Sequence, residues 1–126
     1  MRFLVASVLL ATSSSAALAA DAATPFAEAR KIWEASKDRK EHQTYSSEFV
    51  QFNNHFQLDT KNDCYTLDNG PVELMLVISG NAQRATIEKV LSDVDNAKAR
   101  CFKKSYGGVP TKSPPFTPFV LQMTMD

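Results

Sequence analysis

The chain has few of the residues that usually carry enzyme chemistry. Its 126 residues include two histidines, two cysteines and four glycines, and neither a glycine-rich phosphate loop nor a G-x-S-x-G nucleophile elbow is present. Lysine plus arginine and aspartate plus glutamate balance at 14 each, so the excess of positive charge that drives nucleic-acid binding is missing. We therefore expect a protein that is not an enzyme, holds no metal or cofactor and binds no nucleic acid.

The cysteines and histidines form no recognisable catalytic or metal-binding motif. The sequence has no C-x-x-C, and His42 and His55 lack the spacing of zinc ligands. A cysteine nucleophile needs a base within hydrogen-bond reach. His55 could formally supply that base to Cys64 or Cys101. In an exported chain an even pair of cysteines is more simply a disulfide, and we expect one between Cys64 and Cys101.

The longest apolar run lies at the N-terminus. Arg2 is followed by an apolar segment over 3–11 and by small residues that end in Ala17-Leu18-Ala19. This order is typical of a secretory signal peptide with an A-x-A cleavage site, and the run is about half as long as a membrane span requires. We expect a signal peptide over 1–19, cleaved after Ala19 (alternatively after Ala20 or Ala22), and a periplasmic mature protein without a stable membrane span.

Two amphipathic patterns predict two helices in the region 20–59. Thr24 and Pro25 suit the start of a helix, and the apolar spacing that follows predicts a helix over 26–41. An aromatic face predicts a second helix over 45–57. This face consists of Tyr45, Phe49, Phe52 and Phe56. Core packing is its simpler role, and a platform for a small ligand is the alternative.

The second half of the chain predicts a small sheet. Alternating apolar residues predict a strand over 72–79, and a turn that begins at Gly80-Asn81 predicts a return strand over 85–91. Met75 and Val77 make the second face of the first strand apolar as well, which is typical of a central strand covered on both sides.

One more helix and one more strand complete the predicted fold. Ser92 is the expected N-cap of the helix, and Asp93 and Asp95 are expected in its first turn rather than as a metal-binding or acid–base pair. The last strand is predicted over 119–125. Because Pro118 cannot donate to a ladder, that end of the strand is expected to be unpaired or at the edge of the sheet. The order is two helices, then β-β-α-β over 60–126, an α+β fold with an antiparallel-type sheet.

Residues 64–125 resemble the C-terminal domain of TonB-like proteins, in particular a divergent branch with two cysteines. The segments that carry the resemblance are 72–78 with Ser79-Gly80-Asn81, 90–93, the helix end at 97–102, and Pro115-Phe116-Thr117-Pro118-Phe119. In that family a β-β-α-β unit pairs with peptides or outer-membrane transporters through its last strand. Full energy transducers have an inner-membrane anchor and a proline-rich spacer, whereas this chain has the predicted signal peptide and two helical patterns. The resemblance therefore implies a free-standing periplasmic domain.

These observations together predict an exported protein-interaction domain. We expect it to bind an envelope protein or peptide, such as a segment of an outer-membrane transporter, by adding a strand to its sheet edge. The predicted contact residues are Phe116, Phe119, Val120, Leu121, Gln122 and Met123. A secreted inhibitor or immunity-type protein that acts on an envelope hydrolase fits the same size, disulfide and signal, and is the alternative function.

The cleavage site can be tested by intact mass spectrometry of the protein exported by a Gram-negative host. We expect the mature chain to begin at Ala20. Replacing Ala17 by phenylalanine should block processing, because the third residue before the cut must be small, whereas Leu18→Phe at the unrestricted position should be cleaved normally. A wild-type protein that retains residues 1–19 in the periplasm would contradict the assignment.

Overall fold

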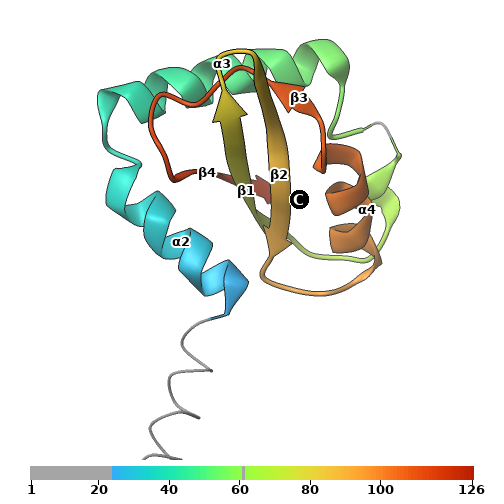
Figure 1. Cartoon of the computed structure of the whole chain (residues 1–126). Coiled ribbons are helices and arrows are strands. Elements are labelled where there is room, and N and C mark those ends of the chain that lie inside the picture. Colours follow the sequence, from blue (N-terminus) through green and yellow to red (C-terminus); the bar gives the residue numbers. More distant parts are fainter. Residues whose placement is uncertain (1–23, 61) are drawn as a thin grey trace, which may run out of the picture.

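The computed structural model describes residues 24–60 and 62–126 (Figure 1). The predicted signal peptide and its cleavage sites lie outside these residues. The described elements are α2 (Pro25–Ser36), α3 (Lys40–Phe56), the 3-10 turn η1 (Cys64–Thr66), β1 (Val72–Asn81), β2 (Arg84–Ser92), α4 (Ala97–Tyr106), β3 (Pro110–Thr111) and β4 (Phe119–Met125). They confirm an α+β fold with an antiparallel sheet. None of the helices described is long and apolar enough to cross a membrane.

The sheet is curled and has the strand order β3-β2-β1-β4. β1 is therefore central, and β4, which has the bounds that the sequence predicted, lies at an edge as expected. β3 was not predicted, since it is a two-residue strand in the proline-marked loop. The β1–β2 turn lies at Ala82-Gln83, just after Asn81, whose side chain accepts hydrogen bonds from the N–H groups of Gln83 and Arg84 at 3.0 and 3.2 Å.

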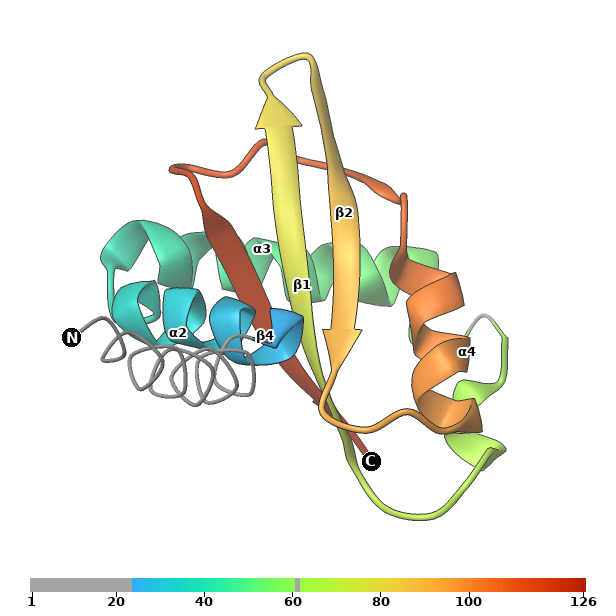
Figure 2. The ribbon, with the colours of Figure 1, turned by 60° about the horizontal axis from the view of Figure 1, so that its bottom comes forward.

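Helices cover both faces of the sheet (Figure 2). On one face α2 packs through Ala29 and Trp33 against Met75 of β1 and Val120 of β4. On the other face α3 and α4 pack against the opposite side chains of β1 and β4. This larger cluster includes Tyr45, Phe49, Leu74, Leu76, Phe102, Tyr106, Phe119 and Leu121. The prediction of a central strand that is covered on both sides is confirmed, and the helical region 24–56 shares its core with the sheet.

The predicted helix over 26–41 was wrong at its end. α2 stops at Ser36, whose hydroxyl donates to the Ile32 carbonyl at 2.9 Å, and α3 begins at Lys40 rather than at residue 45. No glycine or proline marks this break. It follows from packing, because α2 and α3 cover opposite faces of the sheet and one straight helix cannot do both.

The predicted N-cap at Ser92 was also wrong. Ser92 ends β2, where it pairs with Leu74, and the N-cap of α4 is Asn96, whose side chain accepts from the Ala99 N–H at 2.8 Å. Asp93 is not in a helical turn either, because its carboxylate accepts from the Glu73 N–H at 2.9 Å. Continued pairing with β1 therefore outcompetes a locally plausible cap.

Two links hold α4 against the rest of the domain. The predicted disulfide between Cys64 and Cys101 is present, with an S–S distance of 2.04 Å, and joins η1 to α4. At the start of the helix the buried Lys98 donates from Nζ to the backbone oxygens of Gly70 and Asp126 at 2.9 and 2.6 Å. A buried ammonium is tolerated only when it is hydrogen-bonded in this way.

The disulfide should contribute much of the stability of so small a domain. It closes a loop with a sequence separation of 37, for which the chain-entropy model gives about 4 kcal/mol. We expect the double variant Cys64→Ala with Cys101→Ala to lose about that free energy of unfolding, measured by urea denaturation followed by circular dichroism. Wild-type protein held in reducing agent is the control and should show a similar loss. A decrease below about 1 kcal/mol would contradict the expectation.

Candidate functional site

The outer edge of β4 carries backbone groups that point away from the sheet. In β1 the N–H and C=O of Glu73 both bond to Asp93 beside β2. Because backbone groups alternate in direction along a strand, it is the even-numbered residues of β1 that bond to β4. Their partners in the register are the odd-numbered residues Phe119 to Met125. Val120, Gln122 and Thr124 therefore direct their N–H and C=O groups outward.

His42 of α3 closes the first half of this edge. Its Nε2 lies 2.8 Å from the Val120 carbonyl oxygen and its Nδ1 lies 3.3 Å from the Ser46 hydroxyl. Since a carbonyl only accepts, Nε2 carries a proton, and in the neutral ring Nδ1 accepts from Ser46. The whole residue is 3% exposed, and its ring stacks on Phe119 with centroids 4.7 Å apart. The Val120 carbonyl is therefore already occupied within the domain.

The predicted contact residues are divided between the core and the surface. The side chains of Phe119, Val120 and Leu121 are buried in the core. Phe116 is half-buried at the covered end, where the Arg39 guanidinium lies 3.8 Å from its ring centroid. The structure places the half-buried Gln122 and Met123 at the other end of β4.

The second half of the β4 edge is open and polar. No hydrogen bond from residues 24–60 or 62–126 occupies the N–H or C=O of Gln122 or Thr124. The Gln122 side chain donates to the Thr124 hydroxyl at 2.9 Å and to the Glu73 carboxylate at 3.3 Å. Arg30 of α2 forms an ion pair with the same carboxylate at 2.6 Å. We call the segment Gln122–Met125 the open edge.

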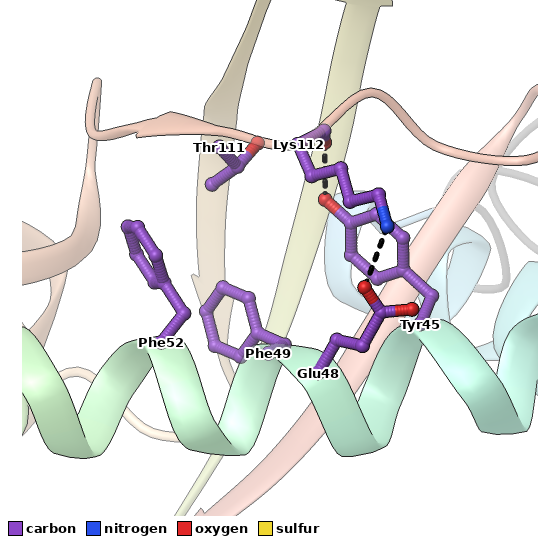
Figure 3. Close-up of a pocket in the computed structure, with 6 residues that line it drawn as sticks. All are labelled: Tyr45, Glu48, Phe49, Phe52, Thr111 and Lys112. Carbon is purple, nitrogen blue, oxygen red and sulfur yellow. Dashed lines mark hydrogen bonds and ion pairs between the residues drawn. The ribbon is translucent and has the colours of Figure 1, made fainter.

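A cavity of about 200 Å³ lies between α3 and the strand β3 (Figure 3). Its apolar part is formed by Phe49 and Phe52, which point from α3 toward Thr111. Its remaining lining residues are Tyr45, Glu48 and Lys112. A more open depression of about 430 Å³ adjoins it, shares Tyr45, Glu48 and Lys112, and extends over Pro114 and Pro115.

Two polar contacts cross from α3 to the chain after β3. The Tyr45 hydroxyl donates to the Lys112 carbonyl at 2.5 Å, and Lys112 Nζ lies 2.6 Å from the Glu48 carboxylate. Burial raises the pKa of the Tyr45 hydroxyl, so it remains a protonated donor at neutral pH. The ion pair is accessible, since the Glu48 and Lys112 side chains are 45% and 70% exposed.

The aromatic face of α3 is partly buried in the core and partly exposed, and the predicted core packing is confirmed for its first two members. Tyr45 and Phe49 are core residues, whereas the half-buried Phe52 lines the cavity and Phe56 is 57% exposed. Glu48 and Lys112 were not predicted as site residues. Nothing local distinguishes them, because a turn-rich loop brings Lys112 back to α3 only in the folded chain.

The thiolate that a cysteine–histidine pair would need is not present in the described structure. Both cysteine sulfurs are in the disulfide, so neither is available as a thiolate for the cysteine–histidine pair considered above. In the part of the chain that the structure describes, no three His, Cys, Asp or Glu side chains gather as metal ligands. In comparisons with known proteins, no family model, curated protein or solved structure matches the chain.

The role of His42 at the edge can be tested by stability measurements. Replacing His42 by phenylalanine keeps the stacking on Phe119 and leaves the Val120 carbonyl without its partner, which should lower the free energy of unfolding by about 1–3 kcal/mol. His42→Gln is the matched control, since its amide can still donate, and it should lose less. An unchanged free energy of unfolding for His42→Phe in urea denaturation would show that the hydrogen bond is not a source of the stability.

Proposed function

We propose that the chain is a non-catalytic interaction domain of the bacterial periplasm, which binds an extended segment of an envelope protein as an added strand on β4. The observation that carries this proposal is the open edge, where Gln122 and Thr124 present outward backbone groups that no described residue covers. Strand addition uses such groups for affinity and the alternating side chains for specificity.

The covered half of β4 sets the register of the added segment. His42 occupies the Val120 carbonyl, so pairing begins at Gln122 and involves about four hydrogen bonds to two residues. A partner segment of about three residues, or roughly 10 Å, spans this length. Its alternating side chains would meet Met123 on one face of the sheet and the polar pair Gln122 and Thr124 on the other.

Two further features agree with this proposal. The disulfide is compatible with an exported protein, as the N-terminal signal pattern predicts. The resemblance of residues 64–125 to TonB-like C-terminal domains favours the same strand as the contact and an outer-membrane transporter as the source of the segment. The polar side chains at the open edge suit a soluble domain that meets its partner transiently.

The proposal can be tested with a proline substitution on the edge. Random octapeptides selected by display on the mature protein provide the probe, and fluorescence anisotropy gives their dissociation constants. Thr124→Pro removes an outward N–H without removing a bond to β1, and should weaken the selected peptides by about tenfold or more, as expected for one lost hydrogen bond and a clash with the added strand.

Thr124→Val is the matched control for this experiment. It loses the same side-chain bond from Gln122 but keeps the N–H, so its peptide affinity should stay close to that of the wild type. Circular dichroism should show that both variants fold. Unchanged binding by folded Thr124→Pro would exclude strand addition at the open edge.

A further inference from the structure

The cavity between α3 and β3 has the size and lining of a site for one aromatic ring. Its volume of about 200 Å³ exceeds that of engineered cavities of about 150 Å³ that bind benzene. The Phe49 and Phe52 rings have centroids 5.9 Å apart and are tilted by 35°. Aromatic rings favour such tilted or edge-on neighbours, so a third ring can pack against both.

Opposite charges stand side by side at the cavity. Glu48 and Lys112 line it together, with 2.6 Å between carboxylate oxygen and Nζ. An exposed ion pair of this kind contributes little stability, so a ligand can open it at small cost. A zwitterionic ligand gives each member of the opened ion pair a new partner, because its carboxylate can accept from Lys112 and its ammonium can donate to Glu48.

We propose that this cavity binds a free aromatic α-amino acid. The ring lies against Phe49 and Phe52, and the ammonium and carboxylate pair with Glu48 and Lys112. An α-amino acid suits the site because its two charges sit on one carbon, as close together as the two protein charges that they meet. The site is separate from the open edge and does not depend on strand addition.

The probe is L-phenylalanine, titrated into ¹⁵N-labelled mature protein and followed by the amide shifts of Phe49, Phe52, Thr111 and Lys112. We expect saturable shifts at these amides. Phenethylamine lacks the carboxylate and 3-phenylpropionate lacks the ammonium, so each should bind about tenfold more weakly than phenylalanine. No saturable shift up to about 10 mM phenylalanine, or equal affinity for all three compounds, would overturn the proposal.

Charge-removing variants assign each contact without disturbing the core. Glu48→Gln should weaken phenylalanine and phenethylamine but leave 3-phenylpropionate unchanged, and Lys112→Gln should weaken phenylalanine and 3-phenylpropionate but leave phenethylamine unchanged. Arg100→Gln is the control, since it breaks a comparable exposed ion pair with Asp95 on α4 and should change none of the affinities. If one of these two variants alone abolished the preference for both the ligand carboxylate and the ligand ammonium, the assigned pairing would be contradicted.

One more probe separates a free amino acid from a peptide side chain. N-acetyl-phenylalanine amide keeps the aromatic ring and carries neither charge, so its affinity should be at least about tenfold lower than that of phenylalanine. If it binds as well as phenylalanine, the cavity recognises only the aromatic ring, as in a residue within a polypeptide, and the proposal of a free amino acid as the ligand is overturned. Peptide binding lost in Thr124→Pro but kept in Glu48→Gln would show that the two sites act independently.

Discussion

The central strand β1 has to be covered on both faces, because apolar side chains alternate to both of its sides. Val72, Leu74, Leu76 and Ile78 point to one side and are buried by α3 and α4. Met75 points to the other side and is buried by α2. A single helix cannot serve both faces, so the chain turns between Ser36 and Lys40. The positions of α2 and α3, and with them the surfaces left open, follow from this requirement.

The placement of α3 decides which backbone groups of β4 are covered and where a cavity remains. Near its start, His42 takes the Val120 carbonyl and closes half of the β4 edge. Further along, Phe49 and Phe52 face β3 across a space that their side chains do not fill. One helix thus covers the Val120 carbonyl at the β4 edge and forms a wall of the cavity. Edge strands invite unwanted pairing, and a buried histidine over one half reduces that risk while leaving a short segment available.

The core of so short a chain needs additional links. Small domains bury a smaller fraction of their surface than large ones and depend more on cross-links. Here the disulfide fixes the η1 side of α4, and Lys98 ties its start to Gly70 and to Asp126. Because the end of β4 is held through Asp126, the open edge is supported by the same contacts that anchor α4.

Local patterns predicted the elements that depend on burial alone. Apolar residues at every second position predicted the bounds of β4, and two apolar faces identified β1 as a central strand, since burial of one face of a strand leaves a period of two in the sequence. The even number of cysteines, together with the predicted signal peptide, predicted the disulfide. The aromatic spacing of α3 predicted a helix, and it left open which of its aromatic residues lie in the core.

The tertiary structure alone decided where elements stop and which surfaces meet. Ser92 is a good helix cap by type, but pairing with Leu74 keeps it in β2, and α2 ends without glycine or proline. His42 and Val120 are separated by 78 residues, and Glu48 and Lys112 by 64. Periodicity records that a side chain is buried or exposed but not against which partner. The β4 edge has one covered half and one open half only when distant segments pack together, and the same is true of the charged cavity.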